Sequence, residues 1–179
     1  MKLFYDLGSP YAYLAVERAE RVLGAAPALE PVLLGAIFAK RGRGSWSQTP
    51  ERERNIAEVE RRAADYGLPP VMWPPGWPPN TLAAMRAATW APDDAFARAA
   101  FRAAFARGVD LADVDVLARI AEEVGLSGDE LRAAIARDEI KQRLKDATER
   151  AWELGVRGVP TLVVDGRVLY GDDRLGEAA

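Results

Sequence analysis

Two short segments near opposite ends of the chain constrain its fold most strongly. In the first, the β-rich run Phe4-Tyr5-Asp6 is followed by Gly8 and then by Ser9-Pro10, and serine followed by proline is favoured where a helix begins. The second, residues 155–166, holds Gly158-Val159-Pro160-Thr161 ahead of a β-rich run and an Asp-Gly pair that favours a tight hairpin. We therefore expect a strand that runs directly into a helix near the start of the chain, and a Val-Pro corner that leads into a hairpin near its end.

The remaining sequence supplies the other elements of an α/β fold. The helix that begins at Pro10 is expected to end at Gly24, and residues 29–34 fit a second strand parallel to the first. From about residue 48 to 154 the apolar side chains recur mainly at helical spacing, with a proline-rich interruption at residues 69–79. After residue 155 the pattern returns to two strands and a short final helix, which Asp172 or Asp173 would cap.

This order of elements predicts a thioredoxin-like sheet, β-α-β…β-β-α, interrupted by an all-helical insertion. We expect one domain over residues 1–179, with the sheet and its flanking helices formed by residues 1–36 and 155–179 and the insertion by about residues 48–154. In such a fold a reactive group at the helix N-terminus faces a cis-proline, so Ser9 would face Pro160. The ligand cleft is expected between the sheet and the insertion.

The chain of 179 residues contains no cysteine and no histidine. The lack of cysteine excludes disulfides, thiol redox chemistry, a cysteine nucleophile and thiolate metal sites, and a disulfide oxidoreductase with them. The lack of histidine removes the usual general base at neutral pH and the commonest nitrogen ligand, so we expect no metal site. Where a redox protein would carry C-x-x-C, this chain carries Ser9-Pro10-Tyr11-Ala12. Its chemistry must use hydroxyls, carboxylates, Lys or Arg, backbone amides or a bound cofactor.

The net charge and the hydropathy pattern limit the partners and the location that we expect for this protein. The net charge of −3 and the sequence pI of about 5.2 argue against a broad nucleic-acid surface. No apolar run approaches the roughly 18 residues that a membrane span needs. The first residues lack the basic, apolar and small-residue pattern of a signal peptide. We therefore expect a cytoplasmic protein that binds neither nucleic acid nor membrane.

Several motifs, in order along the chain, together resemble the 2-hydroxychromene-2-carboxylate isomerase family. They are Phe4-Tyr5-Asp6, Ser9-Pro10-Tyr11, Tyr13-Leu14-Ala15, Gly155-Val156, Gly158-Val159-Pro160-Thr161 and Tyr170-Gly171-Asp172-Asp173-Arg174-Leu175. That family is related to kappa-class glutathione transferases and to DsbA-like thioredoxin-fold proteins. The resemblance implies a DsbA-like fold and an isomerase that depends on glutathione or another low-molecular-weight thiol.

The resemblance also implies roles for particular residues. Ser9 would hydrogen-bond the glutathione sulfur, and the backbone of Val159, before the cis-proline Pro160, would pair with the cysteinyl part of the tripeptide. Asp172 and Asp173 would receive the γ-glutamyl end. In the isomerases the thiolate is thought to add to the chromene, open the ring, allow a bond to rotate and leave again.

Four further residues are candidates for binding a small aromatic substrate. Tyr11 lies beside the helix start, Arg43 belongs to a basic glycine-rich loop, and Trp73 and Trp77 lie in the proline-rich stretch. An arginine offers two-pronged recognition of a carboxylate, and a rigid aromatic loop suits an apolar ring. Arg43 and the two tryptophans also have a plain structural interpretation, because a loop arginine is usually solvated and the tryptophans can simply seal the core.

Two alternatives to the isomerase remain open from the sequence. A kappa-like transferase would use the same thiol site but consume glutathione stoichiometrically. A non-catalytic thiol- or peptide-binding protein would retain the scaffold without turnover, and in that case Ser9 is only a helix cap. A homodimer is compatible with each of these.

Overall fold

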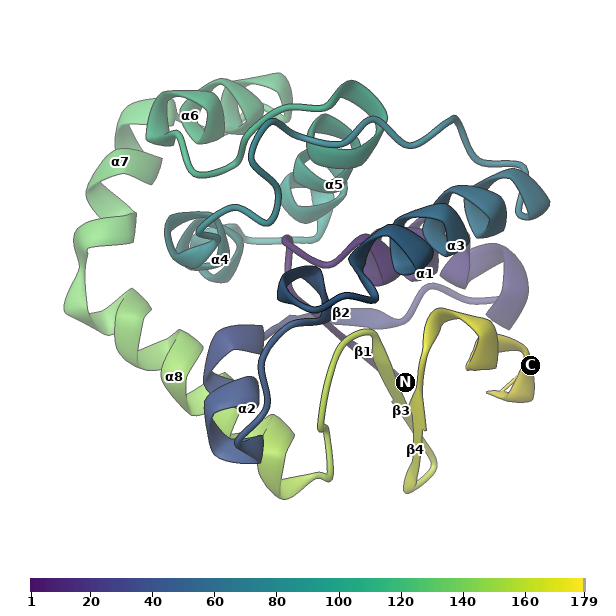
Figure 1. The fold of residues 1–179 in the computed structure, drawn as a ribbon. Helices are drawn as coiled ribbons and strands as arrows, with labels where there is room; N and C mark the ends of the chain where they lie inside the picture. The colour runs from purple at the N-terminus through teal and green to yellow at the C-terminus, as the bar shows by residue number, and fades with distance from the viewer. Residues whose placement is uncertain (179) are drawn as a thin grey trace.

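The computed structural model describes residues 1–178, and its centre is a four-stranded mixed sheet in the order β2-β1-β3-β4 (Figure 1). The strands are β1 (Lys2–Tyr5), β2 (Ala28–Pro31), β3 (Thr161–Val164) and β4 (Arg167–Tyr170). β1 pairs with β2 in parallel and with β3 in antiparallel orientation, and β3 pairs with β4 in antiparallel orientation. The two ends of the chain therefore meet in the middle of the sheet.

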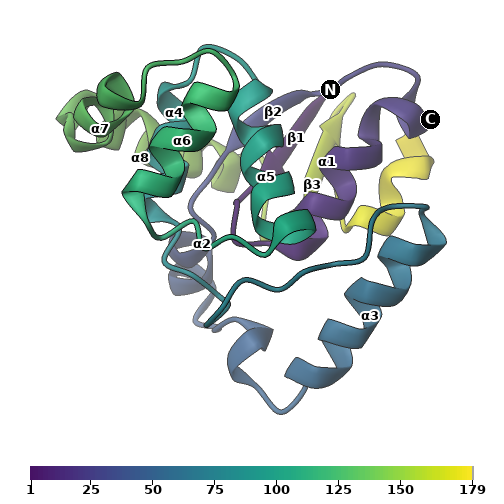
Figure 2. The same ribbon diagram turned by 90° about the horizontal axis from the view of Figure 1, so that it is seen from above.

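Helices fill the rest of the described chain. They are α1 (Pro10–Leu23), α2 (Leu34–Arg41), α3 (Arg52–Asp65), α4 (Leu82–Trp90), α5 (Ala95–Arg107), α6 (Val114–Glu123), α7 (Gly128–Ala136) and α8 (Asp138–Glu153), with short 3-10 helices η1 (Trp46–Gln48) and η2 (Asp172–Ala178). Figure 2 shows α6, α7 and α8 on one side of the molecule and α3 on the opposite side, next to α1. No helix among residues 1–178 is long and apolar enough to cross a membrane.

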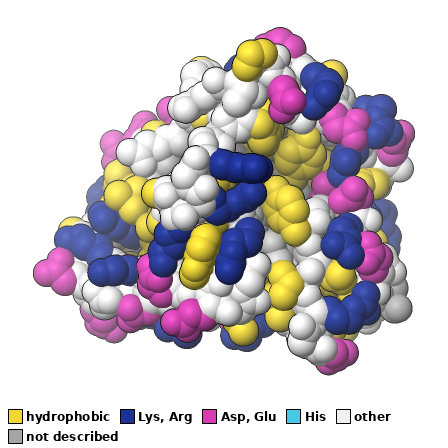
Figure 3. Space-filling model, turned by 60° about the horizontal axis from the view of Figure 1, so that its bottom comes forward, with side chains coloured by type: hydrophobic (Ala, Val, Ile, Leu, Met, Phe, Trp, Pro, Cys, Tyr) yellow, Lys and Arg dark blue, Asp and Glu magenta, His cyan; other side chains and the backbone are white. Residues whose placement is uncertain are grey.

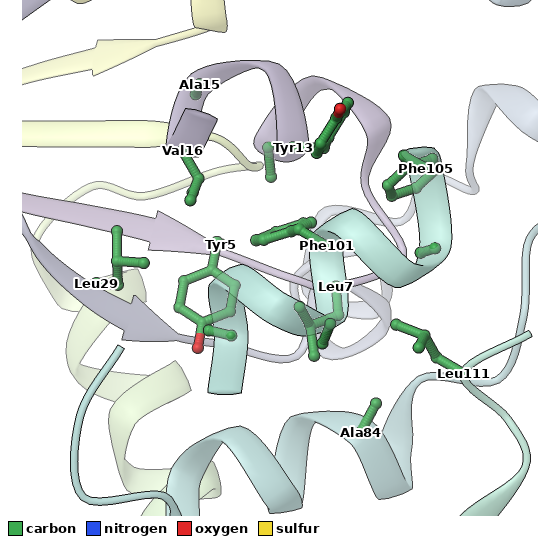
Figure 4. Close-up of a cluster of buried hydrophobic side chains, with 14 of the residues drawn as sticks. Tyr5, Leu7, Tyr13, Ala15, Val16, Leu29, Ala84, Phe101, Phe105 and Leu111 are labelled. Carbon is green, nitrogen blue, oxygen red and sulfur yellow. The ribbon is translucent and has the colours of Figure 1, made fainter. Parts of the chain in front are cut away.

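β1 divides the core because its side chains alternate between the two faces of the sheet. Leu3 and Tyr5 belong to a large buried cluster that includes side chains of α1 and α5, whereas Phe4 belongs to a smaller cluster with Ile37 of α2 and Ala151 of α8. Figure 4 shows the larger cluster, where the rings of Tyr5 and Phe101 lie 5.6 Å apart. The C-terminal end of β1, and therefore the start of α1, is held in place by packing on both faces of the sheet.

The predicted fold class is confirmed, but the second strand and the segment after it differ from the expectation. β2 ends at Pro31, and residues 34–41, which the sequence suggested were strand end and loop, form α2. Ile37 is fully buried against the sheet, and Gly42, at a φ of 62°, ends the helix in the left-handed conformation that glycine adopts without strain. α2 has eight residues, most of them apolar, and only Ile37 is buried, so the sequence shows no alternation of apolar and polar residues at helical spacing.

Candidate functional site

A cavity of about 560 Å³ lies where the turn between β1 and α1 meets the Val-Pro corner before β3. Its other walls come from α2 and the loop after it, from η1 and α3, and from the segment between β4 and η2. Of the residues predicted for the site, the lining includes Ser9, Tyr11, Arg43, Val159, Pro160, Asp172 and Asp173. Segments more than a hundred residues apart in the sequence therefore share one cavity.

Ser9 caps α1 and keeps its own proton available. Its Oγ accepts a hydrogen bond from the backbone N–H of Ala12 at 3.2 Å, and it donates none to any residue in the described part of the chain. Pro10 occupies the first helical position, and the first turn of α1 holds no acidic residue. The first turn of α1 therefore carries no negative side chain beside the hydroxyl, and the helix start and the hydroxyl together suit an anion in the cavity.

Asp6 holds the turn that carries Ser9. Its carboxylate accepts hydrogen bonds from the Gly8 N–H (2.9 Å), the Leu34 N–H (2.9 Å) and the Thr81 hydroxyl (3.0 Å), while its backbone oxygen accepts one from the Ser9 N–H (3.0 Å). Burial raises the pKa of Asp6 above its ordinary value, and these donors oppose the rise. One side chain thus joins the starts of α1, α2 and α4.

The Val-Pro corner lines the same cavity as this turn, and the backbone groups of Val159 there are unpaired within the described residues. The Val159–Pro160 peptide bond is cis, the Thr161 hydroxyl donates to the carbonyl of Gly158 at 2.7 Å, and the Gly171 N–H donates to the carbonyl of Pro160 at 3.0 Å. The N–H and C=O of Val159 form no hydrogen bond to another described residue. An extended backbone segment of a ligand can therefore pair with Val159, as a strand pairs with an open sheet edge.

Gly158 allows Tyr170 to close the corner. A Cβ atom at Gly158 would lie 2.7 Å from the Tyr170 ring, which is closer than carbon atoms approach. The ring of Tyr170, on β4, therefore packs directly on the backbone before Val159, and both Tyr170 and Val159 line the cavity.

Asp172 and Asp173 differ sharply in their surroundings. The Asp172 carboxylate is 1 % exposed, and it accepts hydrogen bonds from Arg62 (2.8 Å) and from the Tyr66 hydroxyl (2.9 Å). Arg18 lies 3.8 Å from the same carboxylate and stacks on the Tyr66 ring. Burial raises the pKa of Asp172, whereas Tyr66 and Arg62 oppose the rise.

The side chain of Asp173, in contrast, is 56 % exposed and lies 3.6 Å from Arg62. Asp172 is therefore already paired within the protein, and Asp173 is the more accessible carboxylate for a ligand ammonium group. The sequence pattern treated the two as equivalent.

Tyr11 and Arg43 lie on the walls of the cavity. The ring of Tyr11 meets that of Trp46 edge-on at 6.0 Å, and the Arg62 guanidinium lies 5.6 Å from its centre. Burial raises the pKa of Tyr11, and the charge of Arg62 opposes this. Arg43 is exposed and forms no ion pair with any residue among 1–178. Figure 3 shows Lys and Arg side chains gathered beside hydrophobic ones near the middle of one face of the molecule.

Trp73 and Trp77 lie behind the wall rather than in it. Trp77 donates from Nε1 to the carbonyl of Gly8 at 3.2 Å and packs on Trp46 with ring centres 5.1 Å apart, while Trp73 packs on Trp77 at 4.8 Å. Of these three tryptophans, Trp46 is the one that lines the cavity. The sequence did not predict Trp46 and Arg62 as lining residues. A signal for Trp46 existed, because it closely follows Arg43 in the basic glycine-rich loop.

The described residues offer no metal centre, since residues 1–178 contain no group of three or more Asp or Glu side chains that could hold an ion. What the arrangement does offer is a hydroxyl donor at a helix start, an open backbone edge opposite it, and both an accessible carboxylate and an unpaired guanidinium. Those groups suit a small ligand that carries an anionic atom, a peptide backbone, an ammonium group and a carboxylate.

Two known proteins are similar to this chain over nearly its whole length. The chain is 28% identical over 180 residues to 2-hydroxychromene-2-carboxylate isomerase of Sphingobium xenophagum, covering 96% of this chain and 92% of that protein. It is 26% identical over 196 residues to human glutathione S-transferase kappa 1, covering 98% of this chain and 87% of that protein.

Solved structures share the fold. One of 2-hydroxychromene-2-carboxylate isomerase aligns with a TM-score of 0.86 at 21% identity, covering 97% of this chain and 89% of that one. The cytosolic disulfide reductase DsbM from Pseudomonas aeruginosa with GSH aligns with a TM-score of 0.61 at 18% identity, covering 99% of this chain and 92% of that one. The model of the DSBA-like thioredoxin domain matches residues 1–179, and the chain therefore belongs to the DSBA-like thioredoxin domain family.

Proposed function

We propose that the protein is a glutathione-dependent isomerase of the 2-hydroxychromene-2-carboxylate type that acts on a small aromatic substrate. The observation that carries the proposal is the free hydroxyl proton of Ser9 at the start of α1, opposite the unpaired backbone of Val159, in a chain without cysteine. This arrangement accepts a thiolate that the protein itself cannot supply. The similarity to the isomerase, over 96% of this chain, supports the choice of reaction.

The protein's part in the reaction is to hold and stabilise the sulfur. Glutathione, when bound, supplies a nucleophilic thiolate that is returned unchanged after the isomerisation. The Ser9 hydroxyl donates a hydrogen bond to that sulfur, and the positive end of the α1 dipole lowers the pKa of the thiol. Val159 pairs with the peptide part of the cofactor, and Asp173 accepts its ammonium group.

The other walls of the cavity suit the substrate. Trp46 and Tyr11 present aromatic surface, and Arg43 presents a guanidinium without a partner among the described residues. An aromatic ring that carries a carboxylate can therefore lie against Trp46 while its charge meets Arg43. Asp6 acts indirectly, because it fixes the turn in which Ser9 lies.

The similarity to human glutathione S-transferase kappa 1, over 98% of this chain, favours a second candidate function, the transfer of glutathione to an electrophile. Both reactions would use the same sulfur site, and they differ in what becomes of the thiol. An isomerase forms many moles of product per mole of glutathione, whereas a transferase consumes one mole for each mole of product.

The proposal is tested by measuring whether glutathione binds and how much glutathione is consumed per mole of product. We expect glutathione to raise the unfolding free energy by about 2.7 kcal/mol at 100 times its dissociation constant. Turnover of a 2-hydroxychromene-2-carboxylate should need glutathione but not deplete it, and S-methylglutathione, which binds without a free thiol, should not support turnover. Depletion in step with product would favour the transferase. If no thiol in a panel stabilises the protein, the thiol-dependent proposal fails.

A further inference from the structure

Trp77 contacts two walls of the cavity without lining it. It lies in the proline-rich stretch between α3 and α4 and is 7 % exposed. Its indole Nε1 donates to the carbonyl of Gly8 at 3.2 Å, and its ring packs on that of Trp46 with ring centres 5.1 Å apart. Gly8 and Trp46 both line the cavity, whereas Trp77 does not. One buried side chain therefore joins the turn that carries Ser9 to the aromatic wall.

The Gly8 carbonyl depends on Trp77 alone. No other residue among 1–178 donates to this carbonyl, and the Gly8 N–H is bonded to the Asp6 carboxylate at 2.9 Å. The Gly8 carbonyl and the Ser9 N–H belong to one planar peptide group, so the bond from Trp77 helps to set where the backbone of Ser9 lies. A hydrogen-bond donor at a reactive site must be held within about 0.5 Å of its productive position. Loss of the indole donor should therefore displace the Ser9 hydroxyl from that position.

Trp77 is itself held in place from the core. Its ring meets that of Trp73 with centres 4.8 Å apart, and the ring of Trp73 meets that of Phe105 of α5 at 6.2 Å. Phe105 is 1 % exposed and packs on Tyr13 of α1 at 5.5 Å. Arg52 of α3 donates to the Trp77 carbonyl at 3.4 Å. A row of aromatic rings thus extends from the cavity wall to the core, and it fixes the position of the indole.

We propose that Trp77 is a positioning residue for both halves of the site. Its indole N–H fixes the turn from which Ser9 donates to the thiol sulfur, and its ring supports Trp46, against which the aromatic substrate lies. The effect on catalysis rests on the proposed function, whereas the effect on the turn does not. A tryptophan that only seals the core would contribute to stability and leave the sulfur site unchanged, and this difference can be measured.

Trp77→Phe removes the indole donor and keeps an aromatic ring against Trp46. We expect kcat to fall about tenfold or more, because a displacement of about 1 Å can lower a rate about 10²-fold. The pKa of the bound thiol should rise, while the KM for the aromatic substrate stays within about twofold of the wild-type value. Replacing Trp77 with benzothienylalanine, which keeps the bicyclic ring and lacks the N–H, gives the same test with less change in volume.

The chain provides a matched control in Trp73. Its indole Nε1 donates to the Glu60 carboxylate at 2.8 Å, and Trp73 does not line the cavity. Trp73→Phe also loses an indole hydrogen bond and keeps an aromatic ring, but it should retain the wild-type rate and thiol pKa. Trp77→Leu removes both the donor and the ring, so the KM for the aromatic substrate should rise as well, by about three- to tenfold.

Amide hydrogen exchange of residues 5–14, measured without ligand, gives a readout that does not depend on turnover. Exchange should be faster than in the wild type in Trp77→Phe and unchanged in Trp73→Phe. Equal exchange in Trp77→Phe and the wild type, or an equal rate and thiol pKa in Trp77→Phe and Trp73→Phe, would refute the positioning role. If the wild type itself shows no thiol-dependent turnover, the proposed function fails instead, and the exchange result alone decides whether Trp77 holds the turn.

Discussion

Replacing Ser9 with alanine separates the two interactions that its hydroxyl can make. The hydrogen bond accepted from Ala12 belongs to the helix cap, and the proton that Ser9 does not use within the described chain is available to a bound sulfur. Loss of a serine cap costs about 0.5–2 kcal/mol of stability. Loss of a donor to a bound or developing anion typically raises a reaction barrier by about 2.7–4 kcal/mol, or about 10²–10³ in rate.

The chain provides a matched control in Ser127, which caps α7. Its Oγ accepts from the Glu130 N–H at 3.2 Å, the same distance as that between Ser9 Oγ and Ala12 N, and it does not line the cavity. Ser127→Ala should therefore show the loss of stability alone. Ser9→Ala should show a comparable loss of stability and, in addition, the loss of rate.

Two measurements distinguish the outcomes. Denaturant unfolding gives the free energy of each variant, and turnover at saturating glutathione gives the rate. Ultraviolet absorbance of the bound thiolate adds a direct readout, because the pKa of the thiol should rise in Ser9→Ala but not in Ser127→Ala. If Ser9→Ala turns over within a few-fold of the wild type, or if Ser127→Ala loses as much activity, Ser9 is a helix cap only.

Four further predictions concern Asp6, Asp173 and the role of metal ions. Asp6→Asn leaves the Leu34 N–H without its acceptor and should destabilise the fold by about 1–3 kcal/mol; an unchanged denaturation midpoint would contradict this. Burial raises the pKa of Asp6 above its ordinary value of 3.8. Its contribution to the unfolding free energy is therefore fully present below pH 3.8 and falls as the pH rises through the pKa of the folded state. We expect the unfolding free energy to depend less on pH in Asp6→Asn than in the wild type. Asp173→Ala should raise the KM for glutathione while kcat at saturation stays nearly constant, since it removes uniform binding; normal glutathione affinity would exclude the ammonium assignment. Activity should survive chelators, and loss of activity that a divalent ion restores would show a metal requirement.

The sequence by itself determined the local structure at the two ends of the fold. Ser9-Pro10 and the Asp165-Gly166 turn depend on backbone preferences of the residues themselves, so their local structure could be predicted without knowing the rest of the molecule. The sequence likewise shows, whatever the fold, that no residue of this chain can supply a thiol or an imidazole.

Tertiary structure decided which groups at the site are free and which are already paired. Asp172 and Asp173 are the same residue type side by side, yet Asp172 is bonded to Arg62, 110 residues earlier, and only Asp173 is largely exposed. In the same way, packing placed Trp46 in the wall and Trp77 behind it. Burial and ion pairing depend on residues distant in sequence, because they are fixed only when the helices and the sheet come together.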